Sequence, residues 1–209
     1  MASDATPTSA GARKKVNRRQ HILETLAQML EQNPGERITT AALARQVGVT
    51  EAALYRHFPS KRKMFEGLIE FIEEALFSRI HRIAAAVPDT GDKLDKSLLL
   101  VLLFAQKNPG LCRVLNGDAL TGEHEGLRSR VSQIYDRLEA ELRKLLREAE
   151  ANSGIHVSMG GAVFVSALVA QVEGRIQQFV RSGFKRLPSQ DWPQVWAVFS
   201  LQLQRRTLA

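Results

Sequence analysis

Apolar residues recur along most of this chain with the three- and four-residue spacing of helices that bury one face. Ile22, Leu26 and Leu30 repeat every four residues ahead of the breaker Asn33-Pro34-Gly35, and they predict a first helix over about 17–32. Two short helices are predicted next, over about 40–47 and 51–58. Their expected N-cap residues are threonines, because a hydroxyl can accept from a free backbone N–H: Thr39 or Thr40 for the first and Thr50 for the second.

Longer periodic segments fill the rest of the chain. They predict helices over about 61–86, 92–107, 109–116, 125–151, 158–182 and 191–205. Long β-branched runs and Asn-Gly hairpin signals are missing, so the expected fold class is all-α, with about nine helices. Three regions are expected: a disordered basic arm over 1–16, a small head over 17–59 and a larger helical body over 60–209.

Positive charge is concentrated in the first third of the chain. The formal net charge is +7, and the first 63 residues hold eleven basic and five acidic side chains, an excess of six. Such a balance favours nucleic acid or an anionic membrane surface as a partner, although a merely solvated basic face would look the same. The arm is either a tolerated end or a phosphate-binding segment, through Arg13, Lys14, Lys15, Arg18 and Arg19.

Other features narrow the class of protein. Cys112 is the single cysteine, which excludes an internal disulfide and fits a reducing compartment. The start lacks an apolar leader core, and the apolar stretch 157–172 is short and interrupted by polar residues. We therefore expect a cytoplasmic protein. The histidines form no metal-ligand motif, and no phosphate loop or catalytic triad has a recognisable spacing, so we expect neither cofactor nor enzymatic activity.

The segment from Ile38 to Lys61 has the properties of a helix-turn-helix. Small and aliphatic residues (Leu43, Ala44 and Val47, then Ala53 and Leu54) would let two short helices cross closely, and Gly48 permits a sharp turn. A recognition helix presents its N-terminal residues to base edges in the major groove. The opposite face of the second helix is then the candidate DNA-reading face: Thr50, Glu51, Ala52, Tyr55, Arg56 and His57.

Other polar residues around this segment are candidates for phosphate contacts. Thr39 and Thr40 stand at a helix N-terminus, where hydroxyls and free N–H groups suit an anion. Arg18, Arg19 and Lys61 add positive charge nearby. Ala52 is small enough to let the backbone approach a thymine methyl.

The order of short motifs in this segment resembles the DNA-binding domain of TetR-type regulators. The shared motifs are TT at 39–40, LA at 43–44, VGVT at 47–50, LYRHF at 54–58 and PSK at 59–61. The resemblance implies an all-α homodimer that binds palindromic double-stranded DNA, with its last two long helices forming the dimer interface. It also leaves open a ligand-responsive repressor, in which a small molecule in the body releases DNA.

Three further segments resemble the nucleoid occlusion branch of that family. They are MFEGLIEFIE at 64–73, KNPGLCRVLNGDAL at 107–120 and FVRSGFK at 179–185. The resemblance implies a protein associated with the nucleoid that, when bound to DNA, antagonises polymerisation of the division protein FtsZ. An idle basic head on a helical interaction module is a third reading, which a salt-dependent gel shift would exclude.

The same resemblance implies a docking groove for the FtsZ C-terminal tail between the fourth and fifth helices. Its residues would be Phe71, Arg79, Leu100, Leu103, Lys107 and Asn108. Arg79 and Lys107 suit an acidic tail. Phe71, Leu100 and Leu103 have an alternative interpretation as ordinary core residues.

Overall fold

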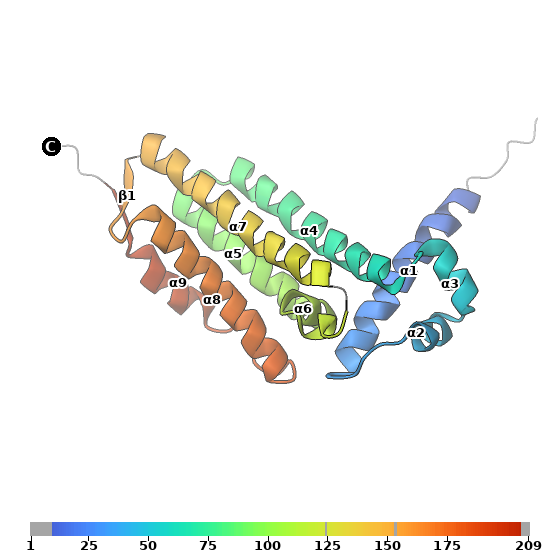
Figure 1. Ribbon diagram of the computed structural model, residues 1–209. Coiled ribbons are helices and arrows are strands. Elements are labelled where there is room, and N and C mark those ends of the chain that lie inside the picture. Colours follow the sequence, from blue (N-terminus) through green and yellow to red (C-terminus); the bar gives the residue numbers. More distant parts are fainter. Residues whose placement is uncertain (1–9, 124, 153, 206–209) are drawn as a thin grey trace, which may run out of the picture.

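The computed structural model describes residues 10–123, 125–152 and 154–205, and within them the chain is almost entirely helical (Figure 1). The head comprises α1 (Ala10–Gln32), α2 (Thr40–Val47) and α3 (Glu51–His57). The body comprises α4 (Lys61–Ala86), α5 (Thr90–Lys107), α6 (Pro109–Leu115), the 3-10 helix η1 (Asp118–Leu120), α7 (Glu125–Asn152), β1 (Ile155–Val157), α8 (Gly161–Arg181), α9 (Trp192–Ser200) and β2 (Leu203–Arg205).

The apolar stripes of the sequence form the core. Ile22, Leu26 and Leu30 on α1 are at most 1% exposed. Six apolar residues that recur at helical spacing along α7 are buried as well: Leu127, Val131, Ile134, Leu138, Leu142 and Leu145. One connected apolar cluster runs from the head through the body, so the all-α prediction and the stripe assignments are confirmed.

The body is a bundle in which α4, α5, α7 and α8 pack side by side, while α6 lies across the end that meets the head (Figure 1). There α6 packs against α1, and α4 leads directly out of the head, with Ser60 as its N-cap. The head lies at one end of the elongated molecule and α9 with the two strands at the other (Figure 1).

Three helix boundaries differ from the predicted ones by three residues or more. The first helix begins at Ala10 rather than near Asn17, so residues 10–16 of the expected disordered arm are helical; alanine, arginine and lysine there all favour helix. Residues 1–9 of that arm lie outside the described residues. The last two helices are shorter than predicted: α8 begins at Gly161, after a turn that follows β1, and α9 ends at Ser200, before β2, which pairs antiparallel with β1.

Candidate nucleic-acid interface and partner-binding groove

Local capping sets the angle between α2 and α3. Thr39 Oγ1 accepts from the backbone N–H of Ala42 at 3.1 Å, and Thr50 Oγ1 accepts from that of Ala53 at 3.2 Å. Between the helices Gly48 has φ 76°, a left-handed conformation that glycine adopts without steric cost. Each threonine hydroxyl still has its own proton to donate, so both remain able to bind phosphate.

The contact faces of the two helices are buried as expected. Leu43, Ala44 and Val47 on α2 and Leu54 on α3 are at most 6% exposed, and Phe58 after α3 is fully buried. The outer face carries the predicted DNA-reading residues. Exposed there are Thr39, Thr50, Glu51, Ala52, Tyr55 and Arg56, and half-buried are Thr40 and His57.

A hydroxyl network ties this face together. Thr40 Oγ1 donates to Glu51 Oε2 at 2.9 Å, and the Tyr55 hydroxyl donates to Thr40 Oγ1 at 3.3 Å. The network spans α2 and α3, which fixes the carboxylate of Glu51 and the ring of Tyr55 on one surface. The side-chain positions of Thr40, Glu51 and Tyr55 are therefore coupled to one another on the outer face of the two helices.

Arg19 joins this surface from α1, whereas Lys61 does not. Arg19 donates to the carbonyl of His57 at 3.3 Å, and its guanidinium lies 4.2 Å from the Phe58 ring centroid. Lys61 Nζ instead lies 2.5 Å from Glu123 in the body, and its side chain is largely buried. Although Lys61 is predicted as a phosphate contact, the structure turns it toward a nearby carboxylate; Arg18 is exposed as expected.

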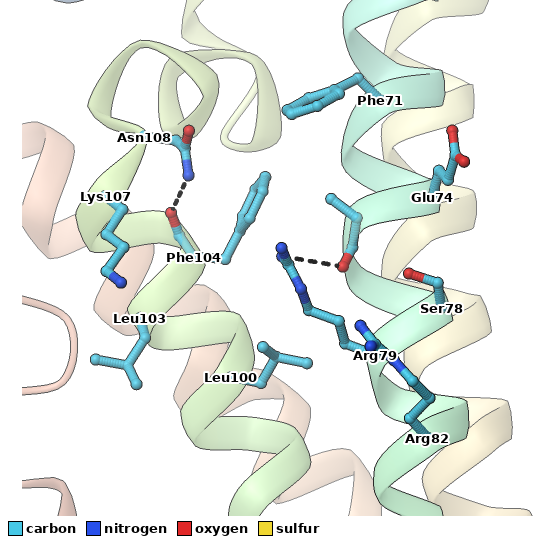
Figure 2. Close-up of a pocket in the computed structure, with 11 residues that line it drawn as sticks. Phe71, Glu74, Ser78, Arg79, Arg82, Leu100, Leu103, Phe104, Lys107 and Asn108 are labelled. Atoms are coloured by element: carbon cyan, nitrogen blue, oxygen red, sulfur yellow. Dashed lines mark hydrogen bonds between the residues drawn. The ribbon is translucent and has the colours of Figure 1, made fainter.

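A second feature is a groove between α4 and α5, which we call the first groove. It encloses about 830 Å³ and is lined by all six residues that the sequence assigns to partner binding: Phe71, Arg79, Leu100, Leu103, Lys107 and Asn108 (Figure 2). Phe71 is 49% exposed and Leu103 38% exposed, so these two are not core residues. Leu100 is half-buried and packs against the core.

The first groove also contains residues that the sequence reasoning missed. Glu74, Ser78 and Arg82 follow Phe71 at helical spacing on α4. That spacing places them on the same helix face as Phe71, so they could have been predicted from the sequence. Ala75 and Phe104 complete the lining. Figure 2 shows Arg79 pointing from α4 into the space between the helices, where it donates to the carbonyl of Ala75 at 3.4 Å.

Asn108 stands between α5 and α6, at the N-cap position of α6. Its side chain does not cap α6; Nδ2 donates backwards to the carbonyl of Phe104 at 2.7 Å (Figure 2). Proline at the first position of α6 has no N–H, so this helix has one fewer unpaired donor at its N-terminus. Asn108 therefore closes the C-terminal end of α5, beside the first groove.

The described residues also bear on two other possibilities, a metal site and a membrane-spanning helix. No group of three or more histidine, cysteine or acidic side chains is arranged to hold a metal ion in that part of the chain. No single described helix is long and apolar enough to cross a membrane; α5 and α6 reach the threshold only as a pair, which bends by 115° at its junction.

Comparison with known proteins agrees with this architecture. Residues 22–68 match the family model of bacterial regulatory proteins of the tetR family, and residues 88–204 match the SlmA-like "Tetracyclin repressor-like, C-terminal domain". The regulator MbdR from Azoarcus sp. CIB superposes with a TM-score of 0.73 at 19% identity, over 90% of this chain and 99% of that one. At that identity the similarity is one of fold.

Curated relatives are far more similar in sequence. The nucleoid occlusion factor SlmA of Marinomonas sp. (strain MWYL1) is 54% identical over 190 residues, which cover 91% of this chain and 96% of that protein. The SlmA of Shewanella woodyi is 53% identical over 192 residues, covering 92% and 98%. The chain therefore belongs to the SlmA family of nucleoid occlusion factors, within the TetR-type regulators.

Proposed function

We propose that this chain, as a homodimer on palindromic chromosomal sites, antagonises FtsZ ring assembly over the nucleoid and thereby inhibits cell division. The observation that carries the proposal is the first groove, which is lined by the six residues that the family resemblance assigns to FtsZ binding, five on α4 and α5 and Asn108 directly after α5. Membership in the SlmA family supports the same role. The proposal places the protein on the nucleoid and assigns it no catalytic step.

DNA binding is assigned to the head, with boundaries at about 17–59, and partner binding to the body, over 60–209. In the head, Ala52 and its neighbours at the start of α3 would face base edges in the major groove. Thr39, Thr40, Tyr55, Arg18 and Arg19 would bind phosphates. In the dimer, two α3 helices would lie about one helical turn of DNA apart.

The first groove suits an acidic, partly apolar peptide, which is the character that we assign to the FtsZ tail. Arg79, Arg82 and Lys107 supply positive charge, while Phe71 and Leu103 supply exposed apolar area. Charged side chains at such a rim steer association and select the partner, and apolar anchors supply much of the affinity.

The interior of the body offers little support for a ligand-responsive repressor. The pocket inside the bundle, between residues such as Leu76, Tyr135 and Ile176, holds about 10 Å³. Pockets for small effectors are typically about 300–1,000 Å³.

The test is FtsZ polymerisation, followed by light scattering, with and without DNA sites selected from the genome by this protein. The wild type should disassemble FtsZ when site DNA is present and much less without it. Thr39→Ala should weaken site binding by about tenfold, equivalent to the net contribution of one charge-assisted hydrogen bond, and should weaken FtsZ antagonism with it.

Phe71→Asp separates the two activities. It should keep site binding and lose FtsZ antagonism, because a carboxylate would repel an acidic tail and remove an apolar contact. Thermal unfolding should stay near the wild-type midpoint, since Phe71 is half exposed. Equal antagonism by the wild type with and without site DNA would refute the coupling between the two sites.

A further inference from the structure

A carboxylate of the body lies against two cations at the edge of the head. Glu123 stands in the turn between η1 and α7, and its Oε1 lies 2.5 Å from Nζ of Lys61 and 3.3 Å from Nε of Arg37. The side chain of Glu123 is only 9% exposed. A carboxylate that has lost most of its hydration stays ionised at little cost only when cations replace the water, and here Lys61 and Arg37 do so.

The turn that carries Glu123 has a defined geometry of its own. The backbone N–H of Glu123 donates to the carbonyl of Leu120 at 3.1 Å, and Gly122 before it has φ 74°. Arg128 on α7 donates to Thr121 Oγ1 at 3.2 Å, which attaches the turn to the helix that follows. The body therefore presents this carboxylate to the head at a fixed position.

Both cations adjoin the elements to which DNA binding is assigned. Lys61 is the first residue of α4, which follows α3 directly. Arg37 stands two residues before Thr39, the N-cap of α2 and a candidate phosphate contact, and the Arg37 side chain is 68% exposed. Because Lys61 and Arg37 contact the same carboxylate oxygen, they are neighbours in space. Two neighbouring cations beside a DNA-binding surface attract a phosphate as well as a carboxylate.

We propose that Glu123 occupies the position of a DNA phosphate in the free protein, and that Lys61 and Arg37 exchange it for a phosphate when the head binds DNA. The inference rests on the DNA binding proposed above and extends it, because it adds two phosphate contacts and a residue that limits them. All DNA sequences carry the same phosphates, so the cost of releasing Glu123 weakens binding to every sequence by the same factor.

Such a competitor suits a protein that must occupy few sites among a large excess of other DNA. Phosphate contacts supply nearly all of the affinity for unrelated sequences, whereas a specific site adds base contacts. When both affinities fall together, less protein is bound to unrelated DNA at a given concentration, while a tight site stays occupied. Glu123 thereby limits the binding that carries no sequence information.

The experiment measures the affinity of the full-length protein for two duplexes of equal length by fluorescence anisotropy. One duplex contains a site selected from the genome by this protein, and the other has an unrelated sequence. Glu123→Gln should bind both duplexes about three- to tenfold more tightly than the wild type, and by the same factor. Glu125→Gln is the matched control, because it removes the same charge at an exposed position two residues further along. Its affinities should stay within about twofold of the wild-type values.

Lys61→Met tests whether the gain arises from the exchange of partners. In the Glu123→Gln protein, Lys61→Met should remove most of the gain, since the released ammonium is the group that binds the phosphate. It should also reduce the slope of log affinity against log salt concentration by about one. If Glu123→Gln gives the same gain with and without Lys61→Met, Glu123 acts only as a nearby negative charge and the inference is wrong.

Thermal unfolding and far-ultraviolet dichroism report whether each variant keeps its fold. Glu123→Gln should lower the unfolding midpoint, because Lys61 and Arg37 lose their partner. If that midpoint falls below the working temperature, Glu123→Asp, whose shorter side chain reaches the two cations less well, should raise both DNA affinities in the same direction. Folded Glu123 variants with unchanged or weaker DNA affinity would show that the ion pairs are purely structural, and the proposed function would stand. If the wild type binds neither duplex, the proposed function fails and the inference fails with it.

Discussion

At the scale of single residues, Arg113 on α6 shows how the head is attached to the body. Its side chain is 2% exposed, and Nη1 donates to the carbonyls of Leu30 and Asn33 at 2.8 and 2.7 Å. These carbonyls lie at the end of α1, where helical carbonyls lack intrahelical partners. Nε donates to Asp118 Oδ2 at 2.6 Å, which neutralises the guanidinium. One side chain therefore joins α1, α6 and η1.

Arg113→Met should destabilise the protein by about 2–4 kcal/mol, because methionine fills similar space but leaves two buried carbonyls without donors. The free energy of unfolding, obtained from urea titration with FtsZ and DNA absent, measures the change. Arg147→Met, at an exposed position of α7, is the control, and its free energy of unfolding should stay within about 0.5 kcal/mol of the wild-type value. Equal stability of the two variants would show that Arg113 is not a structural link.

At Cys112, burial lowers the chemical reactivity of the side chain. Its thiol is fully buried and donates to the carbonyl of Ala105, and burial raises its pKa to about 12. The thiol is therefore protonated at neutral pH, and the reactive thiolate is scarce.

Native protein at pH 8 should react slowly with a chromogenic disulfide reagent, and urea-unfolded protein should react within the mixing time. Absorbance of the released thiol measures both rates. Fast stoichiometric labelling of the native protein would contradict the buried position of this cysteine.

At the scale of elements, α1 and α6 approach each other closely at one glycine. A Cβ atom on Gly110 would lie 1.9 Å from the carbonyl oxygen of Ala27, which is backbone of α1 and cannot rotate away. The close contact places α6 against the head.

Gly110→Ala should therefore separate the two helices and cost about 1–3 kcal/mol, as overpacking of a tight contact does. The midpoint of urea unfolding should fall while the far-ultraviolet dichroism of the folded state stays helical. In DNA-bound protein the affinity for FtsZ should fall as well. Unchanged stability would mean that α1 and α6 are not in close contact in solution.

At the scale of the whole molecule, apolar side chains are exposed along α8 and α9. Val163 is 60% exposed, Val198 66% and Leu201, directly after α9, 72%. A chain exposes such a surface at a cost unless a second copy covers it. This placement supports the proposal that the last two helices form the dimer interface.

Val198→Glu should convert the dimer to a monomer, since two carboxylates would be buried in a self-complementary interface. Light scattering measures the mass, and affinity for a palindromic site should fall by about tenfold or more while affinity for a single half-site stays constant. Ser132→Glu on α7 is the control. A dimer that persists in Val198→Glu would place the interface elsewhere.

Helix periodicity and capping could be predicted from the sequence because they depend on neighbouring residues. The stripe Ile22–Leu26–Leu30, the caps Thr39, Thr50 and Ser60, and the turn at Gly48 all have local causes. The pairing of β1 with β2 could not be predicted in this way. Its strands have three residues each, lie far apart in the chain, and are stabilised by pairing with each other.

The candidate sites likewise combine features that have local causes with features that depend on the tertiary structure. Local pattern and family resemblance sufficed to predict a candidate reading face on α3 and six residues that line the first groove, because each prediction concerns a short stretch of chain. The packing of α1, α4 and α6 decided what no single segment contains: Lys61 turns to Glu123, Arg113 reaches the end of α1, and residues of α1, α4 and α6 line a common pocket. These features depend on distances between segments remote in sequence, which only the folded chain brings within contact.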